Sequence, residues 1–150
     1  MTRVRLITLV LLSACVSPTT PENDLAEYRA LWEAQGLTDY TFDVVKNCFC
    51  WPMADVRVTV KGGVITGVTE LASEVAHDPE LFRTVDGLFD LVQDAYDRDA
   101  HEVQVDFNSS RGYPIRIWID YVEMMQDEEM GFTLLSDVTA LEMLTRKWAD

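Results

Sequence analysis

Three cysteines and two histidines are the residues of this sequence best suited to chemistry. Cys15 lies near the amino terminus, whereas Cys48 and Cys50 are separated by a single residue. A cysteine thiol can be acylated, paired in a disulfide or bound to a metal. The histidines, His77 and His101, are potential metal ligands and proton carriers. The sequence around each residue decides which of these chemistries is expected.

Cys15 follows a segment with the layout of a signal peptide. Residues 1–5 carry two arginines, residues 6–12 are apolar apart from one threonine, and small residues precede the cysteine. The apolar run is too short to cross a membrane, which takes roughly 20 residues. Leu12 to Cys15 resembles the lipobox of bacterial lipoproteins, in which the cysteine becomes the lipidated amino terminus. We therefore predict a signal peptide over residues 1–14 and lipidation of Cys15. The alternative is an ordinary secretory signal in which Cys15 is incidental.

Residues 15–23 are polar and contain two prolines, which is typical of a tether that cannot pack a core. Two or three acyl chains on Cys15 would hold such a tether stably at a bilayer. Val16 after the cysteine resembles the pattern of outer-membrane sorting. The predicted location is the cell envelope, on the outer membrane facing the periplasm if the cell has two membranes.

The charge of the chain excludes other modes of attachment. Its 12 Lys and Arg against 26 Asp and Glu give a net charge of −14, and removing residues 1–14 leaves 10 against 26, or −16. Nucleic acids and anionic lipids both attract proteins through Lys and Arg. We therefore expect no nucleic-acid partner, and contact with a membrane only through the covalent lipid on Cys15.

Cys48 and Cys50 remain as a pair once Cys15 is acylated. In an oxidising compartment such a pair predicts a disulfide. On an extended strand their Cα atoms would lie about 6.5 Å apart, near the upper limit for bridging, so the strand must bend there. A thiol-redox role for the pair is the alternative, because strained disulfides are reduced more easily. Lys46 is the only nearby cation in the sequence that could stabilise a thiolate.

Neither a metal nor a cofactor is predicted. A zinc site formed by Cys48, Cys50, His77 and His101 would lack the ligand spacing of zinc motifs. The sequence also contains no glycine-rich phosphate loop, no nucleophile elbow and no His-Glu-x-x-His motif. We therefore expect no enzymatic activity.

The acidic run Asp127 to Glu129, with Asp120 and Glu123 upstream, offers the oxygen ligands that calcium prefers. It has no EF-hand pattern, so a solvated acidic loop is the main expectation. A cation-binding structural protein stays open as an alternative.

Hydrophobic periodicity predicts the elements that position these residues. Apolar positions recur at helical spacing over residues 24–35 and 85–96 and alternate as in strands elsewhere. The expected strands are residues 40–44, 56–60, 64–68, 103–107 and 115–121, with Gly62 and Gly63 forming a tight hairpin. Residues 132–144 are expected to begin as a strand and end as a helix.

One helix followed by three strands thus occurs twice, over residues 24–69 and 83–138. This order predicts a single α+β domain over residues 24–150, with an antiparallel sheet and helices packed on one face. Doubled units of this kind occur in PepSY-like and beta-lactamase-inhibitor-like proteins.

Strand alternation also predicts a candidate binding face. Arg116, Trp118 and Asp120 should lie on the side of the sheet opposite the apolar row of Ile115, Ile117 and Ile119. A tryptophan exposed on such a face is typical of a binding surface.

The domain resembles an uncharacterised family of bacterial exported lipoproteins, classed as a domain of unknown function. The resemblance is carried by residues 40–50, 56–63, 84–91, 112–114, 117–121 and 129–132, which include the Cys-x-Cys pair, a Gly-Tyr-Pro turn and the acidic stretch before the last strand. It implies an exported lipoprotein and transfers no catalytic residues. We expect an envelope lipoprotein that acts as a non-enzymatic protein-interaction module, with an unidentified protein partner.

Overall fold

The computed structural model describes residues 21–48, 54–125 and 127–143. Within these ranges the chain forms three helical and seven strand elements. They are α1 (Pro21–Glu33), β1 (Tyr40–Cys48), β2 (Val56–Lys61), β3 (Val64–Glu70), the short 3₁₀ helix η1 (Pro79–Leu81), α2 (Val85–Asp97), β4 (Glu102–Phe107), β5 (Pro114–Asp120), β6 (Met130–Leu134) and β7 (Thr139–Ala140).

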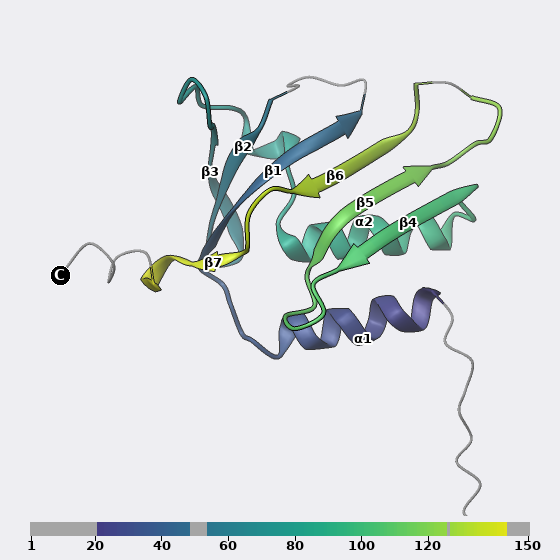
Figure 1. Cartoon of the computed structure of the whole chain (residues 1–150), viewed down its shortest axis with the longest axis horizontal. Coiled ribbons are helices and arrows are strands. Elements are labelled where there is room, and N and C mark those ends of the chain that lie inside the picture. The colour runs from purple at the N-terminus through teal and green to yellow at the C-terminus, as the bar shows by residue number, and fades with distance from the viewer. Residues whose placement is uncertain (1–20, 49–53, 126, 144–150) are drawn as a thin grey trace, which may run out of the picture.

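The strands form one antiparallel sheet in the order β3-β2-β1-β6-β5-β4, and β7 pairs with β1. Helices α1 and α2 lie side by side on one side of this sheet (Figure 1). The predicted α+β class with an antiparallel sheet is confirmed.

The element order contains the predicted repeat, α1-β1-β2-β3 followed by α2-β4-β5-β6. The two units meet where β1 pairs with β6, with Val44 opposite Leu134. The first strand of one unit therefore pairs with the last strand of the other. Because β1 and β6 hold different positions in their units, the two units are not related by a symmetry axis between these strands.

The β2–β3 hairpin forms as the sequence predicts. Gly62 and Gly63 have φ angles of 57° and 76°, the left-handed conformation that two-residue hairpin turns require. The backbone N–H of Gly62 also donates to the Asp39 carboxylate at 2.7 Å. The turn is thereby fixed to the segment that leads into β1.

Helix α1 begins three residues before the predicted boundary at Asp24, so the predicted tether of residues 15–23 loses its last three residues to the helix. The first turn carries Glu22 and Asp24, whose negative charges favour a helix amino terminus. A polar first turn leaves no apolar periodicity, and for that reason the sequence pattern places the start too late.

The carboxyl-terminal segment begins as a strand and ends as a helix, as predicted, with a short additional strand between them. It forms β6, then β7 beside the start of β1, and within the described residues a helix begins at residue 141. The side chain of Ser136, between the two strands, accepts a hydrogen bond from the backbone N–H of Asp43 at 2.9 Å. This bond ties the connection to β1.

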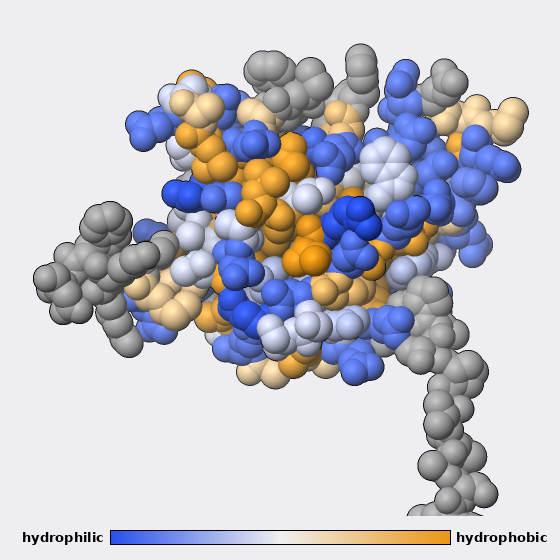
Figure 2. Space-filling model, in the orientation of Figure 1, coloured by the Kyte–Doolittle hydropathy of each residue, from blue (hydrophilic) through white to orange (hydrophobic). Residues whose placement is uncertain are grey.

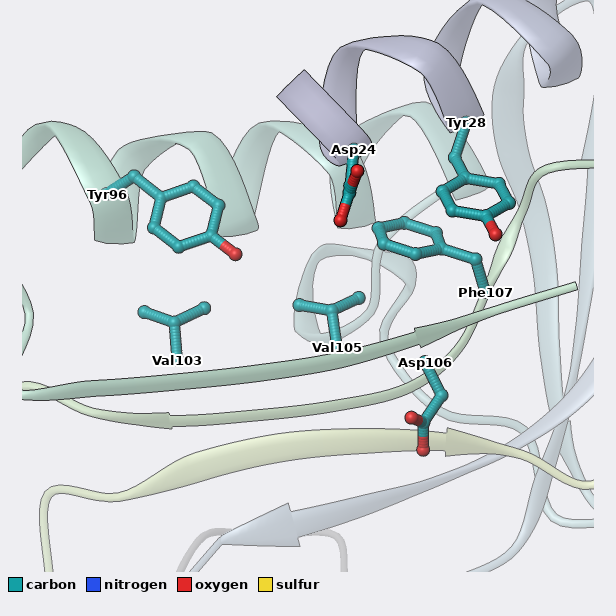
Figure 3. Close-up of a pocket in the computed structure, with 7 residues that line it drawn as sticks. All are labelled: Asp24, Tyr28, Tyr96, Val103, Val105, Asp106 and Phe107. Carbon is teal, nitrogen blue, oxygen red and sulfur yellow. The ribbon is translucent and has the colours of Figure 1, made fainter. Parts of the chain in front are cut away.

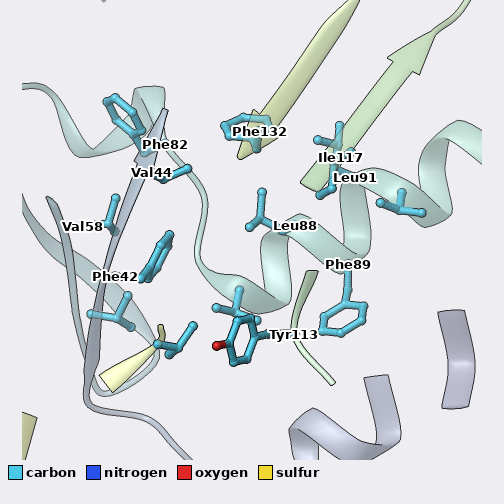
Figure 4. Close-up of a cluster of buried hydrophobic side chains, with 14 of the residues drawn as sticks. Phe42, Val44, Val58, Phe82, Leu88, Phe89, Leu91, Tyr113, Ile117 and Phe132 are labelled. Carbon is cyan, nitrogen blue, oxygen red and sulfur yellow. The ribbon is translucent and has the colours of Figure 1, made fainter. Parts of the chain in front are cut away.

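The core lies between the sheet and the helices. Alternate side chains of the strands meet the apolar face of α2, as Figure 4 shows for Phe42, Leu88, Ile117 and Phe132. Thr84 caps the start of α2, because its hydroxyl accepts a hydrogen bond from the N–H of Gly87 at 3.0 Å.

The Gly-Tyr-Pro turn attaches the β4–β5 connection to α1. Gly112 is buried with a φ of 84°, and a Cβ atom there would overlap the carbonyl oxygen of Tyr28 and lie 2.8 Å from the backbone nitrogen of Trp32. Only glycine fits at position 112, so close to the backbone of α1. Next to it, the Arg111 guanidinium donates to the Gln35 side chain at 2.7 Å and to the carbonyl of Val138.

Candidate functional site

The helices leave the other side of the sheet uncovered among the described residues, and this outer face is the one seen in Figure 1. Figure 2 shows that hydrophilic side chains cover most of it, with a hydrophobic group near its centre. On β5, Arg116 and Trp118 are exposed whereas Ile117 and Ile119 are buried. The alternation that the sequence predicts for these four residues is therefore present.

Trp118 lies on the outer face one strand in from the β4 edge of the sheet. Its neighbours across the sheet are Gln104 on β4 and Gly131 on β6. A Cβ atom at Gly131 would lie 3.2 Å from Cε3 of the indole, so the missing side chain makes room for the ring. The tryptophan nevertheless keeps 36% of its surface exposed.

Two ion pairs lie on this face, one beside the tryptophan and one on the more distant strands β1 and β2. Arg116 contacts Asp106 on β4 at 2.7 Å, with both side chains more than half exposed. On β2, Arg57 binds both carboxylate oxygens of Asp43, at 2.7 and 2.9 Å, and this contact raises the pKa of the guanidinium. Trp118 thus has one oriented ion pair beside it, Arg116 with Asp106, and an exposed aromatic residue next to an arginine is suited to contact with another macromolecule.

Asp120, the third residue of the predicted face, is half-buried and takes part in the β5–β6 hairpin. Its carboxylate accepts a hydrogen bond from the N–H of Val122 at 3.0 Å, and the Glu128 carboxylate accepts from the same N–H at 2.6 Å. The hairpin therefore brings together two of the predicted acidic residues. Across the described ranges, no group of three His, Cys, Asp or Glu side chains is arranged to hold a metal.

Ile115 departs from the predicted apolar row. The register between β4 and β5 shifts at Asp106 and Phe107, so the chain carries an irregularity next to this isoleucine. As a result, Ile115 is 38% exposed, whereas Ile117 and Ile119 are buried. A bulge turns side chains away from strict alternation, and the sequence pattern does not reveal it.

Cys48 is the last residue of β1. Cys50 and Cys15 both lie outside the described residues, so the predicted disulfide, the redox alternative and the lipidation all stay predictions. Two residues before Cys48, the Lys46 ammonium lies 5.2 Å from the centre of the Phe82 ring. Burial, aided by the charge of Arg83, lowers the pKa of Lys46.

The two histidines lie at opposite edges of the sheet. His77 donates its backbone N–H to Val68 of β3, with its ring 3.6 Å from Glu70, whereas His101 precedes β4 and bonds to Tyr121. Because β3 and β4 are the two edge strands, these histidines cannot join one metal site. The fold therefore rules out a zinc site that uses both His77 and His101.

A cleft of about 400 Å³, which the sequence pattern does not indicate, lies between the two helices and β4. Figure 3 shows its lining residues, which are Asp24 and Tyr28 of α1, Tyr96 of α2, and Val103, Val105, Asp106 and Phe107 of β4. The Tyr28 and Phe107 rings stack at 4.4 Å and Val103 and Val105 are only half-buried. The sequence predicts helices on one face of the sheet but not that they leave this space beside β4.

Together these features define an α+β domain with one helix-covered sheet face and one face that the described residues leave open. The chain belongs to the family of unknown function DUF6174, whose sequence profile matches residues 24–140. Searches of curated proteins and of solved structures find no significant match. No helix in the described part of the chain is long and apolar enough to span a bilayer.

Proposed function

We propose that this protein is a bacterial envelope lipoprotein, exported and anchored through an acylated Cys15, which binds a protein partner through the outer face of its sheet. It acts without catalysing a reaction. The signal-peptide layout before Cys15 and the polar segment after it support the anchor. The doubled order of one helix and three strands supports a relationship to PepSY-like or beta-lactamase-inhibitor-like folds.

The exposed Trp118 on an uncovered sheet face is the observation that carries the binding role. Tryptophan and arginine are enriched at the centres of protein interfaces, where they supply much of the binding energy. Here Trp118 is positioned by Gly131, and Arg116 is oriented by Asp106. Little side-chain entropy would then be lost on binding.

Fractionation of cells tests the anchor. Wild-type protein should sediment with membranes and carry acyl chains on Cys15 by mass spectrometry, whereas Cys15→Ser should be released in soluble form. The −16 charge of the mature chain repels anionic lipid, so no second attachment should retain the variant. Membrane retention of Cys15→Ser would contradict the anchor.

Affinity capture from solubilised envelopes tests the binding face. Wild-type protein should retain a specific partner, and Trp118→Ala should lose most of it. Leu31→Ala, which truncates a 38% exposed side chain on α1, away from the outer face, is the matched control and should bind normally. Equal capture by both variants would contradict a role for the outer face.

Thiol counting tests the predicted disulfide. Purified native protein should contain no free thiol, because Cys15 is acylated and Cys48 is paired with Cys50. Rapid exchange of this pair with added dithiols would instead favour the redox role.

A further inference from the structure

The two edges of the sheet differ in how they are protected. Beyond β3, residue Ala76 bridges to Thr69 and the Glu70 N–H donates to the carbonyl of Val75 at 2.8 Å, so the chain covers its own edge there. At the other edge, β4 pairs with β5 alone among the described strands. An open strand edge is a template for a further strand.

Backbone geometry identifies the groups that face this open edge. The N–H of His101 donates to the carbonyl of Tyr121. Hydrogen-bonded and non-bonded pairs alternate in an antiparallel ladder, so Val103 and Val105 also bond to β5. The N–H and C=O groups of the residues between them, Glu102, Gln104 and Asp106, therefore point away from the sheet.

The cleft beside α1 opens onto the same edge. Val103 and Val105 point toward the helices, whereas Asp106 points to the outer face, and all three line the cleft (Figure 3). Because the cleft is lined by side chains from both faces of β4, it must extend around the unpaired edge of that strand. A strand added to β4 would thus place alternate side chains against Val103, Val105 and Tyr96.

The charge around the cleft favours a basic occupant. Asp24 and Asp106 line it, the latter also paired with Arg116 on the outer face, and burial together with the negative charges of Glu22 and Asp24 raises the pKa of Tyr96. A second copy of this chain carries the same net charge, −16 without residues 1–14, and would be repelled. Electrostatic complementarity therefore selects a positively charged segment over self-pairing.

We infer that β4 and its cleft bind an extended segment of a protein partner that adds to the sheet as a further strand, with alternating apolar and basic side chains. This rests on the proposed function and gives the chemistry of the partner. Backbone hydrogen bonds to Glu102, Gln104 and Asp106 would supply affinity, and the cleft would supply specificity.

The test uses the full chain in detergent micelles and a synthetic eight-residue peptide that alternates valine with lysine. NMR should show shifts of the Glu102, Gln104 and Asp106 amides, together with slower amide exchange at Gln104. A peptide in which glutamate replaces lysine should bind at least about tenfold more weakly, because the cleft is acidic.

Gln104→Pro separates strand addition from a side-chain effect. The Gln104 N–H faces the open edge, so proline removes a donor that β4 would offer to the added strand and none from the β4–β5 ladder. Peptide affinity should fall by about tenfold or more, whereas Gln104→Ala, which keeps the N–H, should bind normally. A thermal melt of each variant shows whether its fold is intact, and Asp24→Asn provides a second variant that should weaken binding of the lysine peptide.

Undiminished binding by Gln104→Pro, or equal binding of the two peptides, would overturn the inference. Slow exchange of the Gln104 amide without peptide would also overturn it, because a second copy or another segment of the chain would then occupy the edge. Failure of the proposed function is distinct from these results. It would appear as no partner captured from envelopes by wild-type protein, whichever peptide binds.

Discussion

The indole of Trp118 lies over the backbone of Gly131 on the neighbouring strand, where a Cβ atom would come within 3.2 Å of the ring. The same Cβ atom would lie 2.6 Å from the carbonyl oxygen of Ile117. The glycine therefore does two things. It lets β5 and β6 pair closely, and it holds an exposed tryptophan in one place on the open face.

Gly131→Ala should destabilise the protein by about 1–3 kcal/mol, because the added methyl group overpacks a backbone contact that cannot move freely. It should also shift the fluorescence of Trp118 as the ring is displaced. Chemical denaturation measures the first effect. Gly67→Ala in β3, where a Cβ atom meets nothing within 4 Å, is the matched control and should change stability by less than about 0.5 kcal/mol. Equal stability of the two variants would refute the close contact.

Gly112→Ala should cost about 2–5 kcal/mol, since it combines a left-handed backbone with a clash against the backbone of α1. Gly36 has a similar φ of 60° but open space around its Cβ position, so Gly36→Ala should cost only about 1–2 kcal/mol. Unfolding in denaturant compares the two. A Gly112→Ala variant no weaker than Gly36→Ala would show that the turn does not press on α1.

Arg111→Ala should destabilise the fold by about 2–4 kcal/mol, because Gln35 and the carbonyl of Val138 lose a charged donor. Arg116→Ala breaks an exposed ion pair with Asp106 and should cost at most about 1 kcal/mol. The two variants remove the same side chain, so their melting temperatures can be compared directly. Similar losses would mean that Arg111 does not join α1 to the carboxyl-terminal segment.

Tyr40 predicts how stability depends on alkaline pH. Burial is the largest cause that raises the pKa of its hydroxyl from 10.0 to about 12 in the folded protein. The unfolded state then ionises first, so stability is fully present below pH 10.0 and declines by about 2–3 kcal/mol toward pH 12.

Tyr40→Phe should flatten this decline, although Tyr96, Tyr113 and Tyr121, whose pKa values are also raised, leave a residual slope. At neutral pH the variant should be about 1–3 kcal/mol less stable, because the Val85 N–H loses the Tyr40 oxygen as its acceptor. Denaturant midpoints between pH 8 and pH 12 provide the measurement. Parallel curves for the two proteins would contradict the burial of the hydroxyl.

Much of the fold is predictable from the sequence because its signals are local. The alternation of Val56, Val58 and Val60 predicts β2, and the stripe that includes Leu88 and Val92 predicts α2. Gly62 and Gly63 predict the hairpin between β2 and β3. Each signal lies within a few residues of the element that it specifies.

The remaining features depend on contacts between distant segments. The pairing of β1 with β6 and the contact of Gly112 with α1 join residues that are far apart in the chain. The cleft needs the relative placement of both helices and β4. The outward face of Trp118 follows from alternation, whereas the exposure of Ile115 depends on a bulge that the sequence pattern does not reveal.

Photo-cross-linking in living cells tests the central claim, that the outer face binds a protein partner at the membrane. A benzophenone amino acid at position 104, the exposed residue of β4 opposite Trp118, should give one specific cross-linked protein, and the same group at Leu31, a 38% exposed position on α1, should not. The product from position 104 should disappear in the Cys15→Ser background, since the protein then leaves the membrane. No specific product from position 104, or the same product from both positions, would contradict the claim.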